Sequence, residues 1–208
     1  MRAPKITALA AATVFSISMA ACGSNDDAGD SAAAAPATTG ATPSMNTNLM
    51  VNFGTGCAAV PTDPSDKGSF ASMAQAPVAT AAAGNPLLST LVTAVKKAGL
   101  VDSLNSAQGI TVFAPTNDAF NKIPAADLNK VLADKKTLTD ILTYHVVAGK
   151  LTPADLAGSH QTLEGKDLMV SGAGQDFKVG GTASVICGNV QTANANVYII
   201  DSVLMPTS

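Results

Sequence analysis

The chain has 208 residues with 12 basic and 15 acidic side chains, a formal net charge of −3, three cysteines and no tryptophan. Its only arginine, Arg2, lies at the N-terminus, and aromatic residues make up 4% of the chain. Because nucleic-acid recognition relies on arginine, a positive surface and aromatic stacking, this composition argues against nucleic acid as a partner. It argues equally against electrostatic attraction to an anionic membrane surface.

Residues 1–21 have the pattern of a signal peptide. Arg2 and Lys5 precede an apolar stretch of 16 residues, 6–21, which is shorter than the roughly 20 residues of a membrane-spanning helix. The stretch ends in the sequence MAACG, in which small residues directly precede Cys22, as in a bacterial lipobox. The sequence therefore predicts cleavage before Cys22 and acylation of its thiol, which would anchor the protein to the external face of the bacterial cell membrane. The alternative is an ordinary cleaved signal peptide followed by a chance cysteine.

Residues 22–48 predict a lipid-anchored disordered linker. Apart from Cys22 and Met45, the segment consists of Ala, Thr, Ser, Gly, Pro, Asn and Asp, which cannot bury enough apolar surface to fold. A flexible coil of this length spans about 30 Å. Without the signal peptide, ten basic residues remain against fifteen acidic ones, a formal charge of −5. The remaining residues, 49–208, have the length of one domain.

A helix signal comes first in this domain. Asn85 can cap a helix whose first position is Pro86, and Gly99 follows its last turn. An apolar stripe predicts the buried face of this helix: Leu87, Leu88, Leu91, Val92 and Val95.

A strand and two more helical tracts are predicted next. A short apolar strand covers 110–114, because Pro115 ends it and Thr116 can cap the helix that follows. Pro124 opens a second helical tract, whose inward apolar positions continue to Leu142.

Short strands are predicted for the rest of the domain. The segment 144–149 is predicted as a buried strand that begins with Tyr144 and His145 and ends at Gly149. Glycine turns then separate six shorter strands: Thr162–Leu163, Asp167–Ser171, Asp176–Val179, Ser184–Cys187, Val190–Thr192 and Val197–Val203. Helices on one side of a largely antiparallel β region indicate an α+β fold, and one copy of each motif indicates a single domain.

Three segments in a fixed order carry a family resemblance: TVFAPTNDAF at 111–120, YHVVAG at 144–149 and NVYIIDSVLMP at 196–206. They resemble the two sequence blocks and the intervening Tyr-His motif of fasciclin domains, over residues 76–206. The resemblance implies an antiparallel β-sandwich wedge packed with several helices, and an extracellular adhesion or protein-interaction module rather than an enzyme. The chain is also similar to the mycobacterial surface lipoprotein antigens with a single fasciclin domain. It shares with them the lipobox, a Gly-Cys-Ala element at 56–58 and a late Cys-Gly at 187–188.

The predicted location outside the cell also bears on the cysteines. With Cys22 acylated, Cys57 and Cys187 remain, and two such cysteines in an oxidising compartment predict a disulfide. Closing a loop of roughly 130 residues would stabilise the folded state by about 5 kcal/mol in the chain-entropy model. A redox-active pair is the alternative, but neither a Cys-x-x-Cys motif nor a βαβ pattern accompanies it.

Neither catalysis nor metal binding is predicted. His145 and His160 are the only candidate histidine bases, and Ser159 beside His160 lacks the Gly-x-Ser-x-Gly turn of a nucleophile. A zinc site built from both histidines with Cys57 and Cys187 lacks ligand spacing. Paired carboxylates stay open as an alternative, but most Asp residues stand at predicted helix starts and turns, where capping accounts for them. We therefore expect no enzyme, no cofactor and no metal.

The candidate adhesion surface consists of Asp140, Ile141, Tyr144 and His145. The family resemblance implies it, because the Tyr-His segment of fasciclin domains is tied to integrin binding and Asp140-Ile141 resembles an adhesive element of some animal members. The alternative is that Asp140 is solvated, Ile141 faces the core, and His145 forms hydrogen bonds within the core. Asp201, on an apolar strand, is expected to be a structural hydrogen-bond acceptor.

Two functions remain open from the sequence. The first is a non-enzymatic cell-surface lipoprotein whose fasciclin domain binds an extracellular protein or glycan. Its lipidated N-terminus would be sensed by Toll-like receptor 2 of a host. The second is a lipoprotein that binds a small apolar ligand in a pocket of the wedge.

Overall fold

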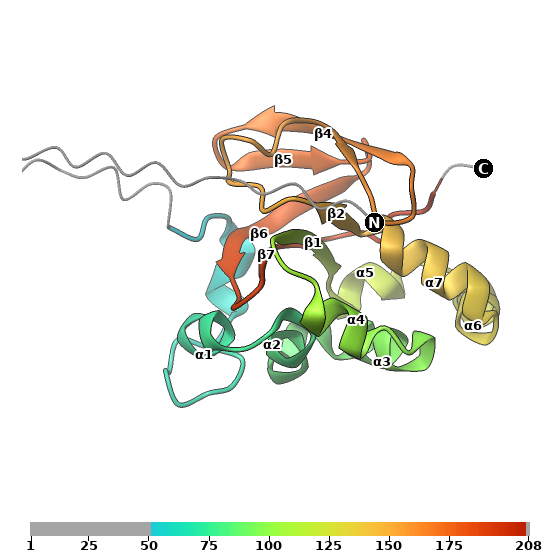
Figure 1. Cartoon of the computed structure of the whole chain (residues 1–208), viewed down its shortest axis with the longest axis horizontal. Coiled ribbons are helices and arrows are strands. Elements are labelled where there is room, and N and C mark those ends of the chain that lie inside the picture. Colours follow the sequence, from blue (N-terminus) through green and yellow to red (C-terminus); the bar gives the residue numbers. More distant parts are fainter. Residues whose placement is uncertain (1–50, 207–208) are drawn as a thin grey trace, which may run out of the picture. The chain divides into compact units, whose positions relative to one another are not determined.

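The computed structural model describes residues 51–206, so the predicted signal peptide and linker, including Cys22, lie outside the described residues (Figure 1). The helical segments are η2 (Thr55–Ala59), α1 (Phe70–Gln75), α2 (Val78–Gly84), η3 (Pro86–Leu88), α3 (Ser89–Ala98), α4 (Val101–Ser106), α5 (Asn117–Asn121), α6 (Ala125–Ala133) and α7 (Lys135–Tyr144). The strands are β1 (Ile110–Pro115), β2 (Val146–Ala148), β3 (Gly158–Gln161), β4 (Asp167–Ala173), β5 (Asp176–Val179), β6 (Ala183–Gln191) and β7 (Ala195–Ile200). The predicted α+β fold is confirmed.

The predicted helix ends form where the sequence places them. The Asn85 side chain accepts a hydrogen bond from the Leu87 N–H at 3.0 Å, at the start of η3 and α3. Gly99 ends α3 in the left-handed conformation, with φ of 75°. Thr116 Oγ1 accepts a hydrogen bond from the Ala119 N–H at 3.2 Å and so caps α5.

The tract predicted from Pro124 onwards consists of two helices, α6 and α7. Asp134 separates them, because its carboxylate accepts hydrogen bonds from the N–H groups of Lys136 and Thr137 and thereby caps α7. Three further helices, α1, α2 and α4, have six or seven residues each and are absent from the sequence prediction. Helices this short carry too few turns to show an apolar stripe.

The strands form one sheet in the order β2-β1-β7-β6-β5-β4-β3. Neighbouring strands are antiparallel except β1 and β7, which are parallel. At the two ends of this order, Val147 forms a bridge with Thr162, and the Leu163 N–H donates to the Val146 carbonyl at 2.8 Å. The sheet therefore curls almost into a closed barrel, which removes much of its free edge.

After Gly149, three strand assignments differ from the sequence prediction. One is the last strand, β7, which covers Ala195–Ile200 and does not continue to Val203. β3 covers Gly158–Gln161, whereas the predicted strand at 162–163 is the turn that reaches across to β2. The strands predicted at 184–187 and 190–192 are both parts of β6, whose register shifts on either side of Cys187. Asn189 lies in this irregular part and has a φ of 60°. The sequence around it therefore has the pattern of a break between two strands.

The sheet separates two hydrophobic cores. Val112 of β1 and Val197 of β7 pack toward the helices, whereas their neighbours Phe113 and Tyr198 point into the barrel. This alternation is the two-residue period of a strand that is buried on both faces. Figure 1 shows α1 to α4 gathered along one side of β1 and β7, with β4 and β5 on the other side.

The described residues form a folded unit with its own interior. Both cores lie between Phe53 and Leu204, within the predicted domain 49–208. No single helix among residues 51–206 is long and apolar enough to cross a membrane. Helix α2 and the segment Pro86–Ala98 reach that length and composition only as a pair bent by 105°.

Candidate functional site

The start of the domain is clamped to β6. The predicted disulfide is present and joins Cys57 of η2 to Cys187, 130 residues apart in the sequence. Beside it, Phe53 and Gly188 exchange backbone hydrogen bonds of 3.2 and 2.8 Å. The Phe53 ring packs so closely on Gly188 that a Cβ at this position would overlap with the ring. The two residues of the Cys-Gly pair therefore each contact the start of the domain. Cys187 forms the disulfide with Cys57, and Gly188 packs against the Phe53 ring.

His145 lies at the end of α7 and not on a strand, which corrects the sequence prediction. Its backbone N–H still bonds to the carbonyls of Ile141 and Leu142, so the helical hydrogen-bond pattern runs through it. The side chain is 2% exposed. Its Nδ1 donates to the Ile141 carbonyl at 2.8 Å, and its Nε2 accepts from the Leu204 N–H at 3.0 Å. These contacts agree with the predicted hydrogen-bonding role in the core.

The two hydrogen bonds define the state of the His145 ring. An acceptor at Nε2 and a donor at Nδ1 require the neutral imidazole with its proton on Nδ1. Burial lowers the pKa of His145 to about 4, against a smaller opposing effect of the hydrogen bond to Ile141. The neutral ring thus ties the end of α7 to the segment that follows β7.

The four residues of the candidate adhesion surface do not share one environment. Asp140 lies on the outer side of α7 and pairs with Lys136, one turn earlier, at 2.8 Å. Ile141, Tyr144 and His145 are buried, with exposed fractions of 6, 8 and 2%. Burial also raises the pKa of Tyr144. Asp140 is the least buried of the four, and the adhesive role of this surface stays a prediction.

Asp201 is placed as a structural acceptor. Its carboxylate accepts a hydrogen bond from the Ser184 N–H at 2.8 Å and pairs with Lys122 Nζ at 3.2 Å. Partial burial by itself would raise the pKa of Asp201, but the hydrogen bonds from Ser184, Lys122 and Ser202 lower it. The residue therefore links β6, the end of α5 and the segment after β7.

An apolar pocket lies between the helical layer and the sheet. Its volume is about 250 Å³, and its walls come mainly from α2, α3 and α4, above a floor formed by β1, β7 and the end of α7. Its most deeply buried lining residues include Leu88, Met73, Ala114 and Val197. Three lining residues are exposed, Thr80, Ala83 and Lys96, and they place the mouth of the pocket between α2 and α3.

Only three of the lining side chains carry polar atoms, namely Thr80, Lys96 and His145. His145 uses both ring nitrogens elsewhere, so it presents carbon to the pocket. The Thr80 hydroxyl accepts a hydrogen bond from Asn105 Nδ2 at 3.3 Å. Lys96 forms no ion pair with any residue among 51–206.

The apolar lining of the pocket determines which molecules it suits. Water gains little there, because it needs two to four polar partners. The pocket is therefore suited to an apolar ligand.

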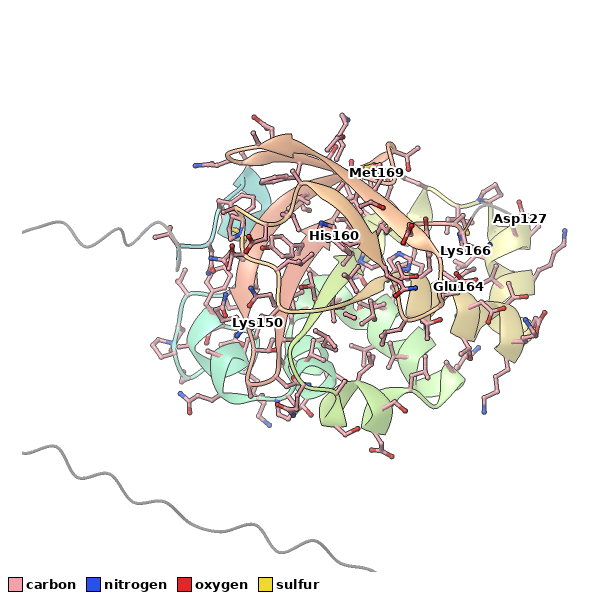
Figure 2. The ribbon with its side chains drawn as sticks, turned by 45° about the horizontal axis from the view of Figure 1, so that its top comes forward. Asp127, Lys150, His160, Glu164, Lys166 and Met169 are labelled. Atoms are coloured by element: carbon pink, nitrogen blue, oxygen red, sulfur yellow. A yellow bond between two sulfur atoms is a disulfide. The ribbon has the colours of Figure 1, made fainter. Side chains whose placement is uncertain are left out.

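The residues weighed for catalysis and metal binding do not come together in one site. Within residues 51–206, no group of three or more His, Cys, Asp or Glu side chains is arranged to hold a metal ion. His160 Nε2 bonds to the Leu156 carbonyl at 2.9 Å and not to its neighbour Ser159. Glu164 pairs with Lys166 at 3.9 Å, and Figure 2 shows this pair away from His160.

A pocket in the wedge was one alternative left open by the sequence, but its location was not predicted. The apolar stripe of α3 was predicted as the buried face of a helix, and α2, which forms the opposite wall of the pocket, was not predicted. Ala79, Ala82 and Ala83 of α2 line the pocket, and their small side chains leave the space open. A run of small residues shortly before a leucine-rich helix is the signal that could have indicated it.

Comparisons with known proteins bear on the family of the chain. The fasciclin domain family matches residues 86–206. The chain is 47% identical, over 90% of its length, to the cell surface glycolipoproteins MPB83 of Mycobacterium bovis and MPT83 of Mycobacterium tuberculosis, and it covers 89% of each. It is 50% identical, over 74% of its length, to the immunogenic protein MPB70 of Mycobacterium bovis, and it covers 81% of that protein. A solved FAS1 domain pair from the insect cell adhesion molecule fasciclin I matches 58% of this chain and 45% of its own. That match has a TM-score of 0.45 and 28% identity.

The sequence relatives decide the family. The matched domain covers more than half of the chain, and the mycobacterial relatives also extend over most of the segment that precedes it. The three motifs that carried the resemblance lie on β1 and α5, at the junction of α7 and β2, and along β7. The chain belongs to the fasciclin-domain family.

Proposed function

We propose that the protein is a non-enzymatic cell-surface lipoprotein whose fasciclin domain binds an extracellular protein or glycan. The observation that carries this proposal is the 47% identity to mycobacterial cell surface glycolipoproteins over 90% of the chain. The lipobox at Cys22 and the linker up to residue 48 would hold the domain at the external face of the membrane. The disulfide between Cys57 and Cys187 supports this location, because disulfides persist in oxidising compartments.

Partner binding is tested with the acyl-free domain, residues 49–208. We expect the immobilised domain to retain an extracellular protein or glycan, which then binds the domain saturably after purification. The variant Asp140→Asn tests the exposed part of the candidate adhesion surface, and Asp127→Asn, on the neighbouring helix α6, is its control. A domain that binds no macromolecule from bacterial or host surfaces contradicts the proposal.

We propose further that the lipidated N-terminus is sensed by Toll-like receptor 2 where the organism meets a host. Reporter cells that carry this receptor should respond to the full chain and not to Cys22→Ala at equal protein concentration. An equal response to both proteins would show that the acyl group is irrelevant to sensing.

The apolar pocket favours a second candidate function, the binding of a small apolar ligand. Its volume of about 250 Å³ and its apolar lining match what such sites require. Native mass spectrometry of the protein isolated from its own cells should show a discrete added mass. The variant Val92→Phe, which places a ring in the pocket, should lack that mass. A protein free of added mass from every growth condition would argue against a carried ligand.

A further inference from the structure

We propose that the pocket between α2, α3 and β1 binds one hydrocarbon chain of about ten carbons that ends in an anionic group. Lys96 at the mouth holds that group. This inference rests on the proposed apolar-ligand function, to which it adds the class of ligand and the residue that selects it.

The volume of the pocket sets the size of the ligand. An engineered apolar cavity of about 150 Å³ accommodates benzene, which has six carbons. At the same packing, 250 Å³ accommodates about ten carbons. A long membrane acyl chain would have to leave several carbons outside, in contact with water, and would gain less from each of them.

The interior of the pocket selects hydrocarbon. Leu91, Val112 and Val197 line its buried part, and the nearby imidazole of His145 has no free nitrogen. A ligand that carried a hydroxyl or carboxylate to this depth would leave that group without a hydrogen-bond partner. The polar end of the ligand therefore stays at the mouth.

Lys96 gives the mouth of the pocket a positive charge. It is the only charged residue that lines the pocket, and no acidic side chain among residues 51–206 neutralises it. Thr80, on the opposite wall, adds a hydroxyl that can serve as a hydrogen-bond donor or acceptor. An anionic headgroup complements this pair, whereas a cationic headgroup would be repelled.

The Lys96 side chain is not needed to satisfy the carbonyl groups at the end of α3. The Lys96 carbonyl already accepts from the Gly99 N–H, and the Val95 carbonyl accepts from the Leu100 N–H, both at 3.1 Å. Lys97 occupies the same helical turn and is exposed, but it does not line the pocket. The two neighbouring lysines therefore form a matched pair in which only one faces the ligand.

The test measures binding of four ten-carbon probes to the domain 49–208 by calorimetry: decanoate, decyl phosphate, decanol and decyltrimethylammonium. We expect both anions to bind more tightly than decanol, and the cation to bind most weakly. Lys96→Met should weaken both anions by about fivefold and leave decanol unchanged, whereas Lys97→Met should behave as the unmodified domain. A preference between decanoate and decyl phosphate distinguishes a fatty acid from a phosphate-bearing lipid.

The outcomes separate the two levels of the proposal. If decanol binds as tightly as the anions, or Lys96→Met leaves the anions unaffected, the selection by Lys96 is wrong while the pocket remains a binding site. If no probe binds, the ligand-binding function itself is wrong. Val92→Phe should abolish binding of every probe, and Thr93→Phe, which adds the same ring on the exposed side of α3, should not. Binding that survives Val92→Phe in a folded protein would place the probes elsewhere.

Discussion

The stability of the domain should fall as the pH is lowered from about 7.5 to about 4.5, and the cause is His145. An imidazole in the unfolded chain takes up a proton near its ordinary pKa of 6.5, whereas burial lowers the pKa in the folded state to about 4. Between these values the unfolded state binds more protons than the folded state. The contribution of His145 is therefore present in full above about pH 6.5 and is lost as the pH falls toward 4.

The size of the effect follows from the two pKa values. The difference between a pKa of 6.5 and one of about 4 corresponds to about 3 kcal/mol of unfolding free energy, of which about 2 kcal/mol is lost by about pH 5. For a domain of this length, each kcal/mol shifts Tm by about 2–4 °C, so the full effect is a fall of about 10 °C. Asp63, Asp134 and Asp201, whose pKa values are lowered from 3.8, lose their contributions as the pH falls below that value. These three carboxylates therefore change the stability mainly at pH values below the range in which His145 changes it.

The assay is urea unfolding of the domain at pH steps across this window. His145→Gln removes the titrating ring and should flatten the pH dependence between about pH 6.5 and pH 4.5. At neutral pH the same variant should lose about 1–3 kcal/mol, because a group that bonded to the ring is left unpaired. His160→Gln is the control, since it removes the other histidine, which is only partly buried, and should keep the slope.

Either of two results would refute this reasoning. If the unmodified domain has the same unfolding midpoint at both ends of the window, the buried ring is charged or accessible in the folded state. If His145→Gln keeps the full pH dependence, another group is responsible for it.

Four further predictions concern other parts of the molecule. Cys22→Ala should move the protein from the detergent phase to the aqueous phase without changing the Tm of the domain, and unchanged partitioning would contradict the lipid anchor. Reduction of the Cys57–Cys187 disulfide should lower the unfolding free energy by up to about 5 kcal/mol, measured in guanidinium with and without reductant. Gly188→Ala should destabilise the domain by about 1–3 kcal/mol because the new methyl group overlaps with the Phe53 ring. Asp140→Asn should leave the denaturation midpoint nearly unchanged because its partner Lys136 is exposed, so a loss of partner binding in this variant would be a direct effect.

Features with a local physical cause could be predicted from the sequence. The caps at Asn85 and Thr116 depend on one side chain and the next two or three residues, and both form. The disulfide was predictable for another reason. The signal peptide and lipobox predict a location outside the cell, and acylation of Cys22 leaves two cysteines that can pair.

Features that depend on contacts distant in sequence could not be predicted. The segment from Tyr144 to Val147 has the composition of a strand, yet α7 extends to Tyr144 because the His145 ring finds Leu204, 59 residues further along, to complete its hydrogen bonds. The parallel pairing of β1 with β7 likewise joins segments that have no local signal of direction. The location of the pocket could not be predicted for a related reason. An apolar stripe has the same pattern whether it packs against side chains or faces an open space, and only the small residues of α2 distinguish the two cases.

The disulfide at Cys57 would have a mechanical consequence under the proposed lipid anchor, which holds the protein by its N-terminus. Tension that enters from that side reaches Cys57 and passes through the sulfur–sulfur bond into β6, which lies between β7 and β5 in the sheet. Helices α1 to α7 all lie in the covalent loop between the two cysteines. Tension that enters at Cys57 therefore bypasses them and does not unfold them one after another. Drag on the domain would then be resisted by the sheet as a whole, and reduction of one bond would convert a shear-resistant attachment into one that unravels from the helical side.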